Sequence, residues 1–124
     1  MDYGIKQAKD ILTLAINHAK KQEDCAKKNV GCYIIKEGEK RTVAAKGYER
    51  EGIHAEKDAF CKLRYDLSKL SLFITRAPLK LYEKEIIGRI SLIVYGGERE
   101  IEDGFLKKLK ENQIEVVHLC DWRE

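Results

Sequence analysis

Two short stretches of the sequence carry residues that could take part in chemistry. The first is His54-Ala55-Glu56, which places an imidazole and a carboxylate two residues apart, where an apolar helical pattern begins. A histidine can hold a metal ion or move a proton, and a nearby carboxylate can act as a general acid or base. The positive end of a helix also favours a bound anion or hydroxide. The triplet alone is weak evidence, because an ordinary helix start with a capping carboxylate looks the same.

The second stretch is FITRAPLKLYEKEII, residues 73–87, which contains the only proline of the chain. A nearly all-apolar run ends just before Pro78, and a charged helical pattern follows it. This order predicts a strand that leads into a helix, with Pro78 at or beside the first helical position, where a missing N–H costs nothing. Leu79 and Tyr82 follow the proline, three residues apart.

The elements that must position these residues are predicted from hydrophobic periodicity. Alternation of helix with buried strand over the second half implies right-handed crossovers and parallel pairing, and an opening hairpin adds an antiparallel edge. The sequence therefore predicts an α/β fold, a three-layer α/β/α sandwich with a mixed five-stranded sheet, in a single domain spanning 1–124. The predicted order is helix 3–21, strands 30–36 and 41–48, a helix from His54, strand 70–75, helix 78–89, strand 90–97, helix 104–112 and strand 114–122.

With these elements in order, the chain resembles the cytidine and deoxycytidylate deaminase superfamily over nearly its whole length. Zinc-dependent deaminases carry His-x-Glu followed by Pro-Cys-x-x-Cys, in which His and two Cys hold zinc and the Glu moves protons. HAE matches the first half, and VGCYII, AAKGYE, LSLFITRAP and GRISLIVYGG are similar, in the right order, to strands of that family. The resemblance implies a cytidine deaminase-like fold with Glu56 as the catalytic proton shuttle. It also implies that Tyr48, Glu49, His54 and Tyr82 lie at the substrate pocket.

The family pattern fails where the other metal ligands should stand. Read from Pro78, the two cysteine positions are occupied by Leu79 and Tyr82. A catalytic zinc site needs three protein ligands and a water, and the family set retains His54 alone. Without zinc the pKa of the attacking water is not lowered toward 7. We therefore expect no metal and no other cofactor, and a vestigial role for Glu56.

Other residues could in principle replace the lost thiolates. Cys61 lies seven residues beyond His54, about 10 Å along a helix axis, which is too far to share one zinc ion. Recruitment of His18, His118 or Cys32 stays open, and zinc would then be the cofactor. The chain has four cysteines and no CxxC pair, so we expect buried or partly buried free thiols.

Glu49 is a further departure from the family. It stands where the resemblance implies an asparagine that contacts the substrate's sugar. An acidic side chain at that position should repel a nucleotide phosphate lying nearby.

The composition describes a soluble globular protein with a charged exterior, 44% hydrophobic and 36% charged. Its formal net charge of +3 neither demands nor excludes an anionic partner. No apolar run approaches the ~20 residues of a membrane-spanning helix, and no signal peptide is predicted. We therefore expect a cytoplasmic protein without a membrane partner.

Three functions remain open from the sequence. The leading one is a deaminase-fold protein that has lost zinc-dependent activity and serves in nucleotide binding, or as a scaffold or regulatory subunit of a homo- or hetero-oligomer. The second is an active deaminase of a cytosine nucleoside, nucleotide or nucleic acid that uses a non-standard metal set, a reading that the retention of His54 and Glu56 supports. The third is a nucleic-acid-binding module, whose basic patch would combine KKLKEN (107–112) with Lys62, Arg64 and Lys69.

Overall fold

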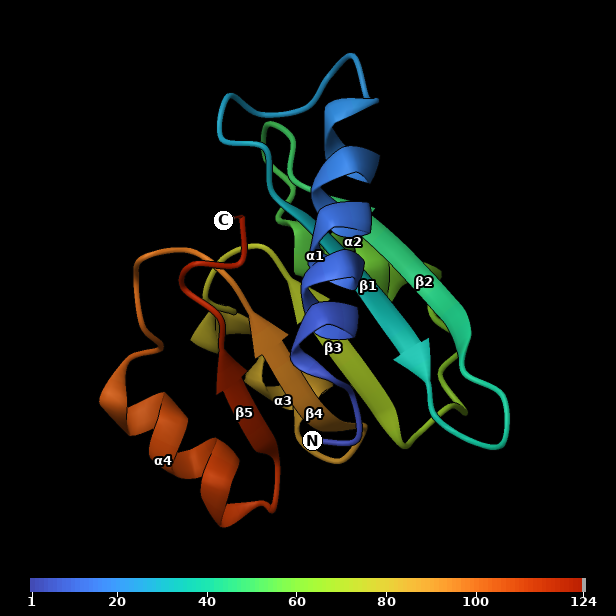
Figure 1. The fold of residues 1–124 in the computed structure, drawn as a ribbon, viewed down its shortest axis with the longest axis vertical. Helices are drawn as coiled ribbons and strands as arrows, with labels where there is room; N and C mark the ends of the chain where they lie inside the picture. The colour runs from blue at the N-terminus through green and yellow to red at the C-terminus, as the bar shows by residue number, and fades with distance from the viewer. Residues whose placement is uncertain (124) are drawn as a thin grey trace.

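The computed structural model describes residues 1–123 as a five-stranded sheet between two layers of helix. The strands lie in the order β2-β1-β3-β4-β5, with β2 and β5 at the two edges (Figure 1). The bounds are α1 Ile5–Lys20, β1 Gly31–Lys36, β2 Thr42–Tyr48, α2 Ala55–Lys62, β3 Leu70–Ile74, η1 Lys80–Tyr82, α3 Glu83–Ile86, β4 Ile90–Tyr95, α4 Asp103–Glu111 and β5 Glu115–His118.

The sheet is mixed, as the sequence predicts. β1 pairs antiparallel with both β2 and β3, whereas β3–β4 and β4–β5 are parallel. The parallel pairs are those whose connections contain a helix, because a parallel neighbour can be reached only by a crossover. The predicted three-layer α/β/α sandwich is confirmed.

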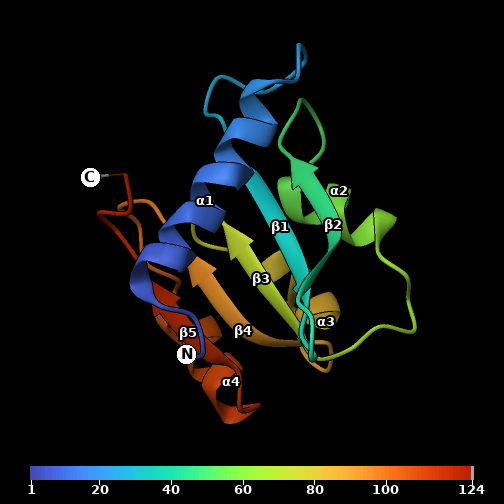
Figure 2. The same ribbon diagram turned by 45° about the vertical axis from the view of Figure 1, so that its right-hand side comes forward.

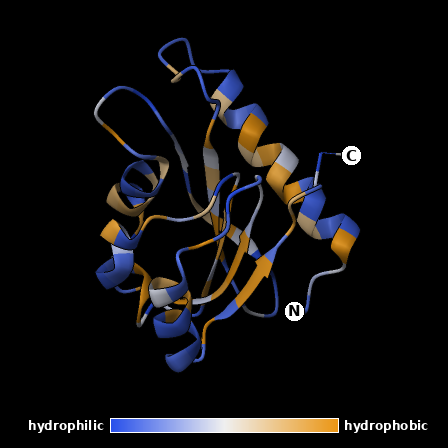
Figure 3. Cartoon of the chain, turned by 90° about the vertical axis from the view of Figure 1, so that its left-hand side faces the viewer, coloured by the Kyte–Doolittle hydropathy of each residue, from blue (hydrophilic) through white to orange (hydrophobic). Residues whose placement is uncertain are grey.

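Each face of the sheet is covered by its own helices. α1 lies across one face, and α2, α3 and α4 cover the other (Figures 1 and 2). Hydropathy follows this arrangement, with apolar residues on the strands and on the sides of the helices that face them (Figure 3). The core is therefore two apolar layers, one on each side of the sheet.

Two glycines let helices approach the sheet closely. A Cβ at Gly31 would lie 1.9 Å from the Ala15 carbonyl oxygen of α1. A Cβ at Gly47 would lie 2.3 Å from the Ala55 carbonyl oxygen of α2. Both distances are too short for any side chain, so these glycines fix how deeply α1 and α2 sit on the sheet and where the start of α2 lies.

The helix predicted from Pro78 to Arg89 is wrong at both ends. The chain is extended at Leu79 (φ −90°, ψ 138°), a 3₁₀ turn begins at Lys80, and α3 ends at Ile86. The backbone stays extended at Leu79 because its N–H donates a hydrogen bond to the buried carboxylate of Glu56. The helix stops early because the chain turns at Ile87, which is extended (φ −68°, ψ 126°), and at Gly88, which takes a left-handed conformation (φ 95°).

The last strand is also shorter than the predicted 114–122. β5 ends at His118, and the chain then turns back so that Trp122 packs on Gly96, where an added Cβ would lie 2.0 Å from the indole nitrogen. Among residues 1–123, no helix is long and apolar enough to cross a bilayer.

Candidate functional site

The residues that the sequence singles out gather at one end of the sheet. The end of β2 lies beside the start of β1, because the Glu49 N–H donates to the Val30 carbonyl at 2.8 Å. The end of β3 lies beside the same point, because the Thr75 hydroxyl accepts a hydrogen bond from the Gly31 N–H at 3.1 Å. Crevices outside the carboxyl ends of parallel strands are the usual ligand sites of α/β sheets. The start of α2 lies against the segment after β3, because Arg76 and the Leu79 N–H donate hydrogen bonds to Glu56, and this brings the His54-Ala55-Glu56 triplet to the same end of the sheet.

Glu56 is fully buried and its carboxylate is held on both oxygens. Arg76, two residues past β3, donates from Nη2 to Oε1 at 2.7 Å and from Nη1 to Oε2 at 2.9 Å. The Leu79 N–H donates to Oε2 at 2.9 Å. This fork-to-fork pair is the strongest form of a charge-assisted hydrogen bond between side chains. The carboxylate is thus bound by protein donors and shielded from water.

Arg76 also bridges to Glu49. Its Nη2 lies 2.6 Å from Glu49 Oε1, so one guanidinium serves two carboxylates. Burial alone would lower the pKa of Arg76, but the hydrogen bonds and charges of Glu56 and Glu49 outweigh it and raise the pKa. The repulsion expected between Glu49 and a phosphate is weakened only in part, because the single positive charge of Arg76 is shared between Glu49 and Glu56.

His54 and Tyr82 form a second pair. His54 is the residue before α2, and its Nδ1 lies 2.8 Å from the Tyr82 hydroxyl. The two rings meet edge to face with centroids 5.8 Å apart. Burial raises the pKa of the Tyr82 hydroxyl, and the nearby Glu56 charge raises it further. At neutral pH Tyr82 is therefore a neutral phenol that shares a hydrogen bond with the imidazole.

Tyr48 lies apart from this group. Its hydroxyl donates to Asp24 at 2.7 Å, and the Arg50 guanidinium lies over its ring at 4.7 Å. Its N–H donates to Asp58, which is also paired with Arg50. Of the predicted site residues, the structure thus brings Glu49, His54, Glu56 and Tyr82 together and places the Tyr48 side chain in a different network.

A cavity of about 820 Å³ opens at this end of the sheet. Its lining includes Glu49 as well as Arg76 and Leu79, the two residues that hydrogen-bond to Glu56. Glu56 itself does not line the cavity, which agrees with its complete burial. A ligand in this cavity would contact Arg76 and not Glu56.

The rim of the cavity is rich in basic side chains. All are exposed, and within residues 1–123 none of them forms a salt bridge; they are Lys20, Lys27, Lys28, Lys80, Arg99 and Arg123. The acidic side chains on the rim are Glu98, Glu100 and Glu102. Free lysines and arginines around a concave site raise the local concentration of anions.

Sequence reasoning missed Arg76 and this basic rim. Arg76 is the residue two positions before Pro78, so it stood inside the quoted stretch, but no spacing rule pairs it with Glu56. The rim comes from five separate segments, and only the fold brings them together. An arginine directly after a buried strand, at the edge where the HAE triplet is predicted, is the signal that could have been noticed.

No group of three or more His, Cys, Asp or Glu side chains among residues 1–123 is arranged to hold a metal ion. Cys32 is buried, its thiol donates to the Ala55 carbonyl at 3.3 Å, and burial raises its pKa well above the usual range. The ring of His118 stacks on Tyr95, and its Nε2 lies 2.6 Å from the Gly97 carbonyl.

The expectation of buried or partly buried thiols holds for Cys25 and Cys32 and is wrong for the other two cysteines. Cys61 is exposed, because it points away from the face of α2 that packs on the sheet. Cys120 is exposed in the turn after β5.

The fold is similar to those of several solved proteins, among them two deaminases. Acinetobacter baumannii RibD matches with a TM-score of 0.73 at 21% identity, over 93% of this chain and 35% of RibD. The dCMP deaminase of cyanophage S-TIM5, solved with dCMP and dUMP, matches with a TM-score of 0.69 at 22% identity, over 96% of this chain and 99% of that one. The Rib2 deaminase of Aspergillus oryzae, solved with DARIPP, matches with a TM-score of 0.63 at 18% identity, over 91% and 84%.

The chain has the deaminase fold. It spans about a third of RibD and nearly the whole of the phage dCMP deaminase. No protein-family model matches the sequence, and no curated protein is detectably similar to it. The predicted fold is confirmed, while the roles of individual site residues remain predictions.

Proposed function

We propose that this chain is a deaminase-fold protein that does not carry out zinc-dependent deamination and whose cavity binds a nucleotide. One observation carries the first half of the proposal. The carboxylate expected to shuttle protons, Glu56, is fully buried, held on both oxygens by Arg76 and by the Leu79 N–H, and absent from the cavity lining. A general acid or base must reach the proton it moves, directly or through one water.

The donor set around His54 does not fit the zinc ion of the family. The positions that the resemblance assigns to cysteines hold Leu79, which has no lone pair to give, and Tyr82, whose raised pKa keeps it a neutral phenol. Catalytic zinc takes three protein ligands that are deprotonated or neutral donors, and here one imidazole is in place and already hydrogen-bonded.

The basic rim supports the second half of the proposal. The cavity has the size of a small-molecule site and carries unpaired lysines and arginines around its mouth. A nucleoside monophosphate offers a base for the apolar and polar lining and a phosphate for the basic side chains of the rim. The phage dCMP deaminase was solved with two such ligands, dCMP and dUMP. By likeness of fold, dCMP is the first ligand to try.

We further propose that the chain works as a scaffold or regulatory subunit of a homo- or hetero-oligomer. This rests on the resemblance, which implies assembly through helices that flank the site, and on a site built for binding without hydrolysis. Native mass spectrometry of the purified protein, with and without dCMP, tests it. A strict monomer under all conditions would count against a homo-oligomer and leave a different protein as the partner.

The structure gives little support to the hypothesis of a nucleic-acid-binding module. In the patch proposed for it, Lys62 pairs with Asp58, Arg64 with Asp66 and Lys108 with Glu83. Lys107 and Lys110 lie beside Asp103 and Glu111 on α4. Most of this surface is therefore of mixed sign, which does not favour a phosphate backbone.

A combined assay tests the proposed function. Ammonia release from dCMP and cytidine is measured with and without added zinc, and dCMP binding is measured by calorimetry at low salt. We expect no ammonia above background and saturable binding of dCMP. Deoxycytidine, which lacks the phosphate, should bind more weakly. Zinc-dependent ammonia release would instead support the alternative hypothesis of an active deaminase with a non-standard metal set.

Matched variants locate the binding. Lys27→Gln with Lys28→Gln removes two charges from the rim, whereas Lys107→Gln with Lys110→Gln removes two from α4, outside the cavity. We expect only the rim pair to weaken dCMP binding. Equal weakening by both pairs would show non-specific attraction and would remove the support for a nucleotide site.

A further inference from the structure

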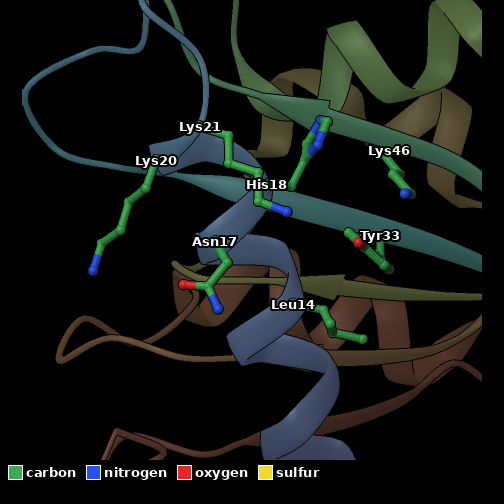
Figure 4. Close-up of a pocket in the computed structure, with 7 residues that line it drawn as sticks. All are labelled: Leu14, Asn17, His18, Lys20, Lys21, Tyr33 and Lys46. Carbon is green, nitrogen blue, oxygen red and sulfur yellow. The ribbon is translucent and has the colours of Figure 1, made fainter.

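A second cavity lies beside α1, and Arg76 does not line it. It measures about 330 Å³ and lies between α1 and the hairpin β1–β2, at the edge of the sheet (Figure 4). Its lining includes Leu14, Asn17, His18, Lys21, Tyr33 and Lys46. Lys20 lies at the border and lines both cavities.

The charge of this lining has one sign. Lys20, Lys21 and Lys46 line the cavity, and no acidic side chain does. None of the three forms a salt bridge within residues 1–123. Figure 4 shows Lys46 reaching in from the strand side, and the ammonium of Lys20 pointing away from the others. Several unneutralised cations at one concave site make a positive potential that an anion would relieve.

His18 adds a hydrogen-bonding atom without a partner. Its Nε2 is covered and makes no hydrogen bond among the described residues. Its ring meets Tyr33 and Tyr48 edge to face, with centroids 6.4 Å and 5.9 Å away. Buried polar atoms nearly always have a partner, so the imidazole beside this cavity has a hydrogen-bonding capacity that the described residues leave unused.

We propose that the cavity between α1 and the β1–β2 hairpin binds a small anion of the phosphate class, held by Lys21 and Lys46 with the His18 imidazole beside them. Lysine acts as a point charge toward phosphate, and a protonated imidazole adds a donor. The volume lies at the lower end of small-molecule sites, which suits an anion carried on a small body. The site shares no residue with the proposed nucleotide cavity except Lys20, so the two proposals can be tested independently.

Binding should draw a proton onto His18. Burial lowers the pKa of His18, and the charges of Lys46, Lys62 and Lys21 lower it further, while Asp58 opposes them. An anion seated among these lysines would offset their charge and let the imidazole ionise. The groups that face His18 are Lys21 on α1, Tyr33 on β1, Lys46 and Tyr48 on β2, and Lys62 and Asp58 on α2.

Inorganic phosphate is the probe for the site. Amide shifts of ¹⁵N-labelled protein are followed by NMR at pH 7 and low salt as phosphate is added. We expect saturable shifts centred on His18, Tyr33 and Lys46, and about fivefold weaker binding for each of Lys21→Gln and Lys46→Gln. Lys107→Gln, which lies on α4 outside both cavities, is the matched control and should bind phosphate as the wild type does. Linear shifts without saturation, or equal weakening by the control, would overturn the proposal.

The role of the imidazole is tested with sulfate, which stays fully ionised across the pH range used. Sulfate should bind more tightly at pH 5.5 than at pH 7.5 in the wild type, and this difference should vanish in His18→Gln. Circular dichroism confirms that the variant is folded. A pH dependence that persists in His18→Gln would exclude the imidazole from the site.

Discussion

The ion pair between Arg76 and Glu56 predicts a large and specific loss of stability in Arg76→Met. Glu56 is fully buried, and the guanidinium supplies two of its three hydrogen bonds. Methionine fills similar space without charge, so the carboxylate keeps the Leu79 N–H alone. Removing one partner of a buried ion pair costs about 3–5 kcal/mol. Arg76 is 23% exposed, so water can enter part of the vacated space, and we expect the lower end, about 3 kcal/mol.

Urea denaturation at pH 7 measures this loss. Small proteins lose about 1–3 kcal/mol of stability per molar urea, so the midpoint should fall by about 1–3 M. Protonation removes the stranded charge, so the deficit should shrink as the pH is lowered from 8 to 5. Arg64→Met is the matched control, because Arg64 pairs with Asp66 at the surface, with both side chains more than half exposed, and such pairs contribute little.

The double variant Arg76→Met, Glu56→Gln separates charge from packing. It removes both charges, and it should recover a large part of the stability because no buried charge is left. If Arg76→Met costs less than about 1 kcal/mol at pH 7, or if its deficit does not change with pH, Glu56 is not held by Arg76 in the way described and the reasoning fails.

Three further predictions concern the other groups. The double variant Leu79→Cys, Tyr82→Cys should bind zinc together with His54, as measured by competition with a zinc chelator. If the folded variant binds no zinc, or binds it equally well when His54→Ala is added, the assignment of these two positions from Pro78 is wrong. Tyr82→Phe should cost about 1 kcal/mol in urea denaturation, because it leaves His54 Nδ1 without its hydroxyl partner; an unchanged midpoint would mean that the bond contributes nothing. The pKa of His18 is lowered in the folded protein, so the fold loses stability as the pH falls below the unfolded value of ~6.5 and the imidazole must ionise in an unfavourable place. The urea midpoint should therefore drop more between pH 7.5 and pH 5.5 in the wild type than in His18→Gln. An equal drop in both proteins would contradict this role of His18.

The sequence predicted the architecture because its signals are local and repeated. Each buried strand is a compact apolar run, and each helix has an apolar face, so β3, β4 and the crossover between them could be placed from periodicity alone. The short helix at Lys80–Ile86 could not, because a contact with Glu56, distant in sequence, holds Leu79 extended.

The site was predictable only in part for the same reason. The HAE triplet, at the start of the predicted helix from His54, and Pro78, after the predicted strand 70–75, marked the two segments that meet in the structure. The arginine that joins them is an ordinary charged residue in the sequence, and its role appears only when the end of β3 is set beside the start of α2. Likewise, Tyr48 is next to Glu49 in the chain, but alternation along β2 directs its side chain to Asp24.

The central claim is that this deaminase-fold site works without zinc, and the metal content of the protein tests it most directly. The protein is purified without chelators, dialysed against zinc, freed of loosely bound metal and analysed by mass spectrometry of the metals, with His54→Ala treated in parallel. We predict far less than one zinc per chain in both proteins, with no difference between them. Stoichiometric zinc in the wild type that is lost in His54→Ala would contradict the account and restore an active metal centre.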